Sequence, residues 1–306
     1  MKFQEALREI QSLKKKVRSL TREIESVKAG SIEDSSSVEK MLRMRGIRVF
    51  RKNPTERLFF PSDFSPLYKI RFYEMMKKYS FRLVLRDMIK FQDRFRIRDL
   101  TRYCSSKVVQ GYCKQLCDMG VIIKNERGNY QTQVSPLYSF GPTLEWFVAE
   151  MLKKEFSSPA IYGVSIKNTP SGGDYDVIAS WNQRLVYIEV KSSPPKGIEQ
   201  NEISTFFSRM DDILPDVGFL FNDTQLRMKD KLVVMFEKDL GKRYGGESKT
   251  LYPVKRLMDE LFHVQHRVFI VNSKKDVVEN FQICLKDYLY YASLLPTETV
   301  SQCRKR

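Results

Sequence analysis

Residues 173–191 read GDYDVIASWNQRLVYIEVK, and this stretch decides the fold because polar and apolar residues alternate on both sides of Asn182-Gln183. Alternation with a period of two is typical of a half-buried β-strand. A two-residue connection between such runs is typical of a tight hairpin turn. We therefore expect strands over residues 175–181 and 185–191, joined as an antiparallel hairpin.

The position of the turn fixes which residues face each other across this hairpin. The expected opposed pairs are Ser180 with Leu185, Ile178 with Tyr187, Asp176 with Glu189, and Asp174 with Lys191. Because alternate residues share a face, we expect the four charged residues together on one face and an apolar set on the other. That apolar set is Val177, Ala179, Trp181, Val186, Ile188 and Val190.

The charged residues lie at the end of the hairpin away from the turn. Two carboxylates opposed across a hairpin, here Asp176 and Glu189, repel each other unless a cation lies between them. Oxygen ligands at this spacing suit Mg²⁺ or Mn²⁺. Lys191 points into the same site, where it can hold a metal-polarised water and balance charge on a phosphate. The pattern indicates a hydrolytic site, and a solvated ladder of salt bridges is the alternative.

The same residues resemble the PD-(D/E)XK, or restriction endonuclease-like, nuclease superfamily over about residues 137–222. The motif consists of an Asp before apolar strand residues, then Ile188-Glu189-Val190-Lys191, with a Glu-bearing helix upstream. The resemblance implies a catalytic core of Asp176, Glu189 and Lys191, with the two acids as metal ligands. It also makes Glu145 the upstream carboxylate, although an acid in the first turn of a helix is explained equally well by the helix dipole. Asp174 either assists the metal or pairs with Lys191.

Upstream of this motif, the sequence predicts helices over residues 65–78, 82–91, 97–103 and about 105–119, followed by a hairpin of 121–124 with 130–134. This order resembles a winged helix-turn-helix over roughly residues 70–134. The resemblance implies that the helix from Lys107 to Met119 enters the major groove, with Arg127 at the tip of the wing against the backbone. Lys107, Gln110 and Lys114 fall on the polar side of that helix. Winged helices that contact only proteins are the alternative.

Charge is distributed unevenly along the 306 residues, whose net charge is +16. Residues 1–140 hold 30 Lys and Arg against 15 Asp and Glu, and residues 141–306 hold 23 against 22. A basic half joined to a neutral half is typical of a polyanion-binding module attached to another domain. We expect nucleic acid, DNA in particular, as the partner, while excess charge that only keeps the protein soluble is the alternative.

The first 28 residues place apolar side chains at alternating steps of three and four. These positions are Phe3, Ala6, Ile10, Leu13, Val17, Leu20, Ile24 and Val27. This heptad predicts a coiled coil and hence a homodimer, with a lone helix folded back on its own chain as the alternative. Residues 29–37 read as a linker, and residues 38–61 are basic and irregular, as expected of an arm that follows phosphates.

The resulting prediction is a multidomain protein. A coiled coil (1–28) and a linker with a basic arm (29–64) precede a mainly α winged-helix domain (65–136) and an α/β restriction endonuclease-like domain with a central mixed sheet (137–306). The function predicted is Mg²⁺- or Mn²⁺-dependent hydrolysis of DNA, and the alternative is a binding protein with an inactive nuclease-like domain. The sequence shows no signal peptide and no apolar stretch of membrane-spanning length, which favours a cytoplasmic protein that does not bind membranes.

Other residues carry weaker signals. Gln200 and Arg209, on a helix expected over residues 198–210, are candidates for substrate contact, with an ordinary polar helix face as the alternative. His263 and His266 lack acidic or thiol neighbours at ligand spacing, which argues against a metal role. Residues 241–250 are expected to form a basic loop. The five cysteines show no repeated spacing, which predicts free thiols.

Overall fold

The computed structural model describes residues 37–91, 93–134, 136–167 and 169–293. The predicted coiled coil of residues 1–28 and most of the linker lie outside the described residues. Among the described residues, no helix has the length and apolar content that crossing a membrane requires.

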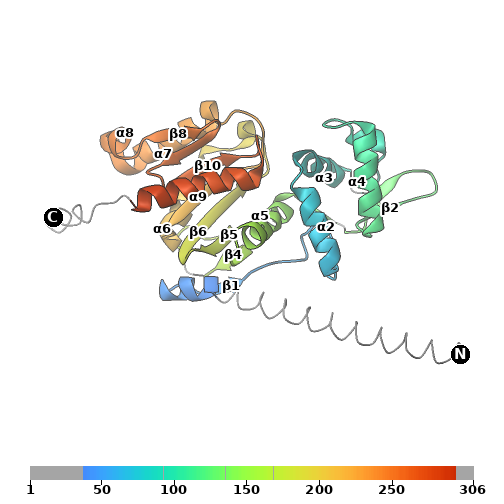
Figure 1. Cartoon of the computed structure of the whole chain (residues 1–306), viewed down its shortest axis with the longest axis horizontal. Coiled ribbons are helices and arrows are strands. Elements are labelled where there is room, and N and C mark those ends of the chain that lie inside the picture. Colours follow the sequence, from blue (N-terminus) through green and yellow to red (C-terminus); the bar gives the residue numbers. More distant parts are fainter. Residues whose placement is uncertain (1–36, 92, 135, 168, 294–306) are drawn as a thin grey trace, which may run out of the picture.

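An eight-stranded mixed sheet forms the centre of the molecule, as predicted for the C-terminal part. Its strand order is β1-β4-β5-β6-β7-β10-β9-β8 (Figure 1). The strands are β1 (Val49–Arg51), β4 (Ala160–Ile166), β5 (Asp174–Trp181), β6 (Arg184–Lys191), β7 (Val217–Asn222), β8 (Val254–Met258), β9 (Leu261–Val264) and β10 (Val268–Asn272). Only the pairs β6–β7 and β7–β10 are parallel within this described sheet.

Helices cover both faces of the sheet, so each face has its own hydrophobic core. Helices α5 (Gly141–Glu155) and α9 (Val277–Ser293) pack on one face, and α6 (Gln200–Ile213) and α7 (Val234–Tyr244) pack on the other (Figure 1). Strand β7 is buried on both faces. Phe219 and Phe221 belong to the core under α5 and α9, here called the α5 core, and Leu220 belongs to the core under α6 and α7, here called the α6 core. A strand that is buried on both faces reads as a continuous apolar run.

The predicted hairpin register is confirmed near the turn. Ser180 pairs with Leu185 and Ile178 with Tyr187. The turn residues Asn182 and Gln183 both have positive φ, of 47° and 59°, as the favoured two-residue hairpin turns require.

Farther from the turn, the predicted pairs do not form. The β5–β6 ladder ends at Val177 and Ile188, so neither Asp176 with Glu189 nor Asp174 with Lys191 is a backbone pair. Strand β5 instead stays paired with β4 as far as Asp174. The sheet is therefore forked between β5 and β6 at the end that carries the acids.

The alternation of faces also changes at the fork. Tyr175 belongs to the α6 core although Val177, two residues on, belongs to the α5 core. The change coincides with Gly163, which lies between the pairs Tyr162–Val177 and Val164–Tyr175 and has a φ of +54°. A left-handed residue interrupts the regular pleat, so a strict period of two does not extend through this part of the strand pair.

The segment before the sheet folds in the predicted element order. It contains α2 (Pro66–Met76), α3 (Tyr79–Lys90), the 3₁₀ turn η1 (Ile97–Leu100), α4 (Ser106–Asp118), β2 (Ile122–Lys124) and β3 (Tyr130–Thr132). These elements do not have a core of their own, because one buried cluster continues from them into α5 and the sheet. Trp146 of α5, for example, lies 4.9 Å from Phe60 and 5.8 Å from Phe72 between ring centroids.

Two predicted irregular segments are ordered elements. Residues 37–44 form a helix whose Val38 and Leu42 are fully buried in the α6 core, and β1 adds an edge strand to β4. Residues 241–250, expected as a loop, lie in the end of α7, in η4 (Gly245–Glu247) and in α8 (Ser248–Leu251). The remaining short turns are η2 (Pro195–Gly197) and the π-helical η3 (Lys229–Val233).

Candidate active site

The fork between β5 and β6 is held open by Asp176. Its Oδ2 accepts a hydrogen bond of 2.7 Å from the backbone N–H of Val190, a donor that ladder pairing of β5 with β6 does not use here. A side-chain carboxylate thus satisfies a backbone group that the sheet would otherwise leave unpaired. This contact places Asp176 beside the strand residues that carry Glu189 and Lys191.

Glu189 lies at the centre of a charged network and is only 2% exposed. The Arg209 guanidinium donates to both of its oxygens, at 3.1 Å and 2.8 Å, and Lys191 Nζ lies 3.0 Å from Oε1. The Tyr187 hydroxyl donates to Oε2. Two cations and a hydroxyl therefore compensate the burial of this carboxylate.

Lys191 is held between two carboxylates. Its Nζ contacts Glu189 and also Glu202 Oε1, at 2.9 Å, in the first turn of α6. Burial alone lowers the pKa of Lys191, but the nearby Glu189 and Glu202 more than compensate, so its pKa is raised above the ordinary value. Lys191 is a fixed cation rather than a proton acceptor.

Glu145 approaches the fork from the second turn of α5, so its predicted position in the first turn of the helix is wrong. A Cβ added at Gly163 of β4 would lie 3.7 Å from Glu145 Oε2, an ordinary contact, but only 2.7 Å from Pro54, so glycine is needed where the segment before α2 crosses β4. Burial, then Glu189 and Asp174, raise the pKa of Glu145 to about 7. Burial, Glu189 and Glu145 likewise raise the pKa of Asp176. The structure thus brings Glu145, Asp176, Glu189 and Lys191 into one electrostatically coupled group.

Asp174 occupies a different position from the one predicted. It is exposed and accepts a hydrogen bond from the hydroxyl of Ser165 on the neighbouring strand β4. Lys191 instead pairs with Glu189 and Glu202. The predicted pairing of Asp174 with Lys191 is therefore wrong. Asp174 is still close enough to raise the pKa of Glu145.

The donor set agrees with a hard divalent cation only in part. Carboxylate oxygens are the ligands that Mg²⁺ and Mn²⁺ prefer. The oxygens of Glu145, Asp176 and Glu189, however, do not all lie within 4.8 Å of one another in the described part of the chain. Arg209 occupies the cation position at Glu189. Among the described residues, no cationic side chain forms an ion pair with Asp176 or Glu145. A cation shared with Glu189 requires Arg209 to move away.

Sequence reasoning undervalued one residue of this site. Gln200 donates to the backbone carbonyl of Met235 and is structural, but Arg209 belongs to the acidic cluster. Glu202 and Arg209 are seven residues apart, which places them on one face of α6. Gly173, with a φ of +77°, leaves room for Arg209, because an added Cβ would lie 3.1 Å from its Nη2. The seven-residue spacing of Glu202 and Arg209 and the presence of Gly173 were the features of the sequence that indicated a role for Arg209 in this site.

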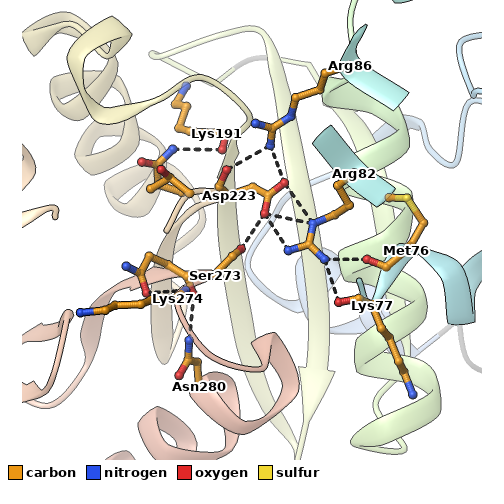
Figure 2. Close-up of polar contacts among 12 residues, drawn as sticks. Met76, Lys77, Arg82, Arg86, Lys191, Asp223, Ser273, Lys274 and Asn280 are labelled. Atoms are coloured by element: carbon orange, nitrogen blue, oxygen red, sulfur yellow. Dashed lines mark hydrogen bonds and ion pairs between the residues drawn. The ribbon is translucent and has the colours of Figure 1, made fainter. Parts of the chain in front are cut away.

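The end of β7 ties the helical segment to this site. Asp223 donates its backbone N–H to the Lys191 carbonyl at 2.8 Å, and its carboxylate accepts two hydrogen bonds from Arg82 Nε and one from Arg82 Nη2 (Figure 2). Arg86 and Ser273 donate to the same carboxylate (Figure 2). Arg82 is 1% exposed and Asp223 fully buried. Helix α3 is thus anchored next to the strand end that carries Lys191.

The four predicted nucleic-acid contacts lie away from the acids. Lys107, Gln110 and Lys114 are exposed on α4, and Arg127 is exposed at the tip of the β2–β3 hairpin. Helix α4 and this hairpin lie on the far side of α2 and α3 from the sheet (Figure 1). Within the described ranges, none of these three cations forms an ion pair. They remain available to phosphates.

His263 and His266 have an acidic neighbour in space that their spacing in the sequence does not show. Asp287 of α9 lies with its Oδ2 2.7 Å from His266 Nδ1. The contact joins residues 21 positions apart and depends on how α9 crosses the sheet.

Cys104, Cys113, Cys117 and Cys284 are free thiols, as predicted.

Comparison with known proteins adds two distant structural likenesses. No protein-family model and no curated protein sequence match the chain. Protein VC1899 from Vibrio cholerae superposes with a TM-score of 0.47 at 12% identity, over 83% of this chain and 61% of that one. Can2 from Sulfobacillus thermosulfidooxidans, in complex with cyclic tetra-adenylate, superposes with a TM-score of 0.43 at 14% identity, over 82% and 60%. The chain spans about three fifths of each protein, and neither likeness assigns it an activity.

Proposed function

We propose that this chain is a metal-dependent nuclease that hydrolyses phosphodiester bonds of DNA. The observation that carries the proposal is the group of Asp176, Glu189 and Lys191 at the fork of the sheet, with Glu145 approaching from α5. The raised pKa values of Glu145 and Asp176 beside a fixed lysine are costly for stability and typical of functional sites. The resemblance to PD-(D/E)XK nucleases assigns the same residues.

The side chains divide the chemistry among them. Asp176 and Glu189 would hold Mg²⁺ or Mn²⁺, with Glu145 as a third acid, and the cation would polarise the phosphate and an attacking water. The Lys191 ammonium orients that water and balances the charge that develops on the phosphate. Arg209 neutralises the negative charge of Glu189 in the absence of the metal. A bound metal cation would take the place of Arg209 at this carboxylate.

The basic surface of the helical segment supports a nucleic-acid substrate. Lys107, Lys114 and Arg127 would contact phosphates, and Gln110 has the donor and acceptor that match an adenine edge. The helical segment is anchored to the catalytic strands through Arg82 and Asp223, so DNA bound on α4 keeps a fixed relation to the fork.

A substrate panel tests the activity. Linear duplex, branched, methylated and single-stranded DNA, together with RNA of the same sequence, are incubated with the full chain in EDTA and then with excess Mg²⁺ or Mn²⁺. We expect cleavage of at least one DNA only when the divalent cation is present. Absence of cleavage on every substrate, or cleavage that persists in EDTA, would contradict the proposal.

One observation favours a second candidate, a nucleic-acid- or protein-binding protein whose nuclease-like domain is inactive. Both oxygens of Glu189 are already bonded within the protein, which a purely structural network would also achieve. Calorimetry with Mn²⁺ separates the two. A nuclease binds the cation, and Glu189→Ala weakens binding at least tenfold, whereas the scaffold binds no Mn²⁺ in either form.

A further inference from the structure

A polar cavity lies at the opposite end of β6 from the fork. It has a volume of about 640 Å³ and is bounded by the start of β6, strand β8, the β9–β10 turn and the end of α9. Arg184 begins β6 and Lys191 ends it, so the two sites are roughly 23 Å apart. The cavity belongs to the size class of small-molecule sites.

Three cations converge on this cavity without a carboxylate partner. They are Arg184, Lys255 and Arg267. Arg184 donates to the Tyr288 hydroxyl at 2.8 Å, and Arg267 donates to a backbone carbonyl at 3.3 Å. In the part of the chain that the structure describes, none of the three forms an ion pair. Like charges gathered around one hollow repel each other, and an anion in the hollow removes that repulsion.

The acids near the cavity are already engaged. Asp216 accepts the Leu185 N–H at 2.8 Å and lies 3.6 Å from the Arg45 guanidinium. Asp287 is bonded to His266. Neither acid is therefore placed to neutralise the three cations, and the hollow keeps a positive charge.

One wall of the cavity is a stack of three aromatic rings. His266 stacks on Tyr291 with ring centroids 3.3 Å apart and on His263 with centroids 3.8 Å apart. Burial and the neighbouring His266 lower the pKa of His263 to about 4, so this ring is uncharged at neutral pH. Tyr291 is 43% exposed at the end of the stack. An exposed ring at the end of a stack offers a platform for a planar base.

The two histidines and Asp287 have ligand atoms within 4.8 Å of one another, as in a metal site, but their geometry argues against a shared ion. His266 Nδ1 is bonded to Asp287, and His263 Nδ1 accepts the His266 backbone N–H at 3.1 Å. Imidazole lone pairs lie in the ring plane, so rings stacked at 30° direct their remaining nitrogens side by side rather than at one point. The rings act as a wall.

We propose that this cavity binds a nucleotide, with its phosphate on Arg184, Lys255 and Arg267 and its base against Tyr291. Cations and aromatic faces in one hollow match the two halves of that ligand, the phosphate and the base. The nucleotide is either free in solution or the phosphorylated end of a nucleic-acid strand. The site stands apart from the fork and does not depend on nuclease activity.

Trp181 provides the readout, because its ring lies 6.3 Å from that of Tyr288. The chain has two tryptophans, so Trp146→Phe leaves Trp181 as the only one. AMP is titrated into this background in EDTA, with calorimetry of the unmodified chain as a second measurement. Adenosine, inorganic phosphate and a 5′-phosphorylated oligonucleotide are titrated in parallel.

We expect saturable binding of AMP or of the phosphorylated end, with adenosine and inorganic phosphate each at least tenfold weaker. Lys255→Ala and Tyr291→Leu, both at exposed side chains, should each weaken binding about tenfold, while the exposed Lys229→Ala should not change it. Preference for AMP or for the strand end identifies the source of the nucleotide.

Three results would overturn the proposal. The first is absence of saturable binding to AMP and to the strand end at millimolar concentration by both methods. The second is binding that Lys255→Ala and Tyr291→Leu leave unchanged. The third is stoichiometric binding of Zn²⁺ that is lost in His266→Ala, together with no nucleotide binding to the chain.

Discussion

At the scale of single residues, Glu145 makes stability depend on pH. Its pKa is raised from 4.5 to about 7 in the folded protein, first by burial and then by Glu189 and Asp174. Between these values the folded state holds a proton that the unfolded state has released, so the free energy of unfolding falls as pH rises from about 4.5 to 7. Ionised Glu145 is the destabilising form.

Removal of the Glu145 carboxylate should abolish this fall in the free energy of unfolding. Glu145→Gln should match the parent in stability near pH 4 and exceed it above pH 7 by about 3 kcal/mol. Urea unfolding in EDTA across this range measures the difference, with the exposed Glu237→Gln on α7 as the matched control. Equal pH profiles for parent and Glu145→Gln would show that Glu145 is not held in a crowded acidic site.

Arg209 is expected to act as a substitute for the divalent cation. Arg209→Met removes both hydrogen bonds from the guanidinium to Glu189. It should lower the free energy of unfolding by about 3 kcal/mol in EDTA, because a buried carboxylate loses one of its two cationic partners and keeps only Lys191 and the Tyr187 hydroxyl. Added Mn²⁺ should recover most of that loss, since the cation takes the same position. Thermal unfolding with and without Mn²⁺ measures the recovery.

The matched control for this variant is Arg243→Met, which breaks ion pairs with Asp211 of α6 and with Asp239 one turn earlier in α7. Its loss of stability should not respond to Mn²⁺. If Mn²⁺ stabilises the parent, Arg209→Met and Arg243→Met to the same degree, no cation binds at Glu189.

At the scale of elements, the contact between α3 and the end of β7 is expected to be a main source of stability. Arg82 and Asp223 form a buried, bidentate ion pair, and removal of one partner of such a pair typically costs about 3–5 kcal/mol. Arg82→Met should show a loss in this range by chemical unfolding. The surface pair of Arg71 and Asp118, 3.8 Å apart, supplies the control, and Arg71→Met should cost less than about 1 kcal/mol. A small effect of Arg82→Met would mean that the helical segment docks without this contact.

The sequence predicted strands β5 and β6 and how they pair near their turn, because alternation and a two-residue turn are local signals. It did not predict the fork, which depends on Asp176 bonding to the Val190 N–H and on the left-handed Gly163. Nor did it predict Arg209 on Glu189, since that contact joins a helix to a strand across 20 residues. Strands β8 and β9 were missed as well, because their five and four residues show little alternation.

At the scale of the whole molecule, the heptad of residues 3–27 predicts a homodimer that brings two forks onto one duplex. Light scattering should give about twice the chain mass of 36.1 kDa. Deletion of residues 1–30 should give monomers that nick DNA more often than they break both strands. A monomeric full-length chain at micromolar concentration would show that the heptad packs within its own chain.

Hydrolysis of phosphodiester bonds by the residues at the fork can be tested with matched variants. Asp176→Asn keeps an oxygen that can accept the Val190 N–H, Lys191→Met keeps the length of the side chain, and Lys196→Met alters an exposed lysine five residues away. Cleavage rates are measured under single-turnover conditions with saturating Mn²⁺ on the substrate that the parent cuts best. We expect rates at least 100-fold lower for Asp176→Asn and Lys191→Met and an unchanged rate for Lys196→Met. Full activity in Asp176→Asn or Lys191→Met, with the fold intact by circular dichroism, would contradict hydrolysis at the fork.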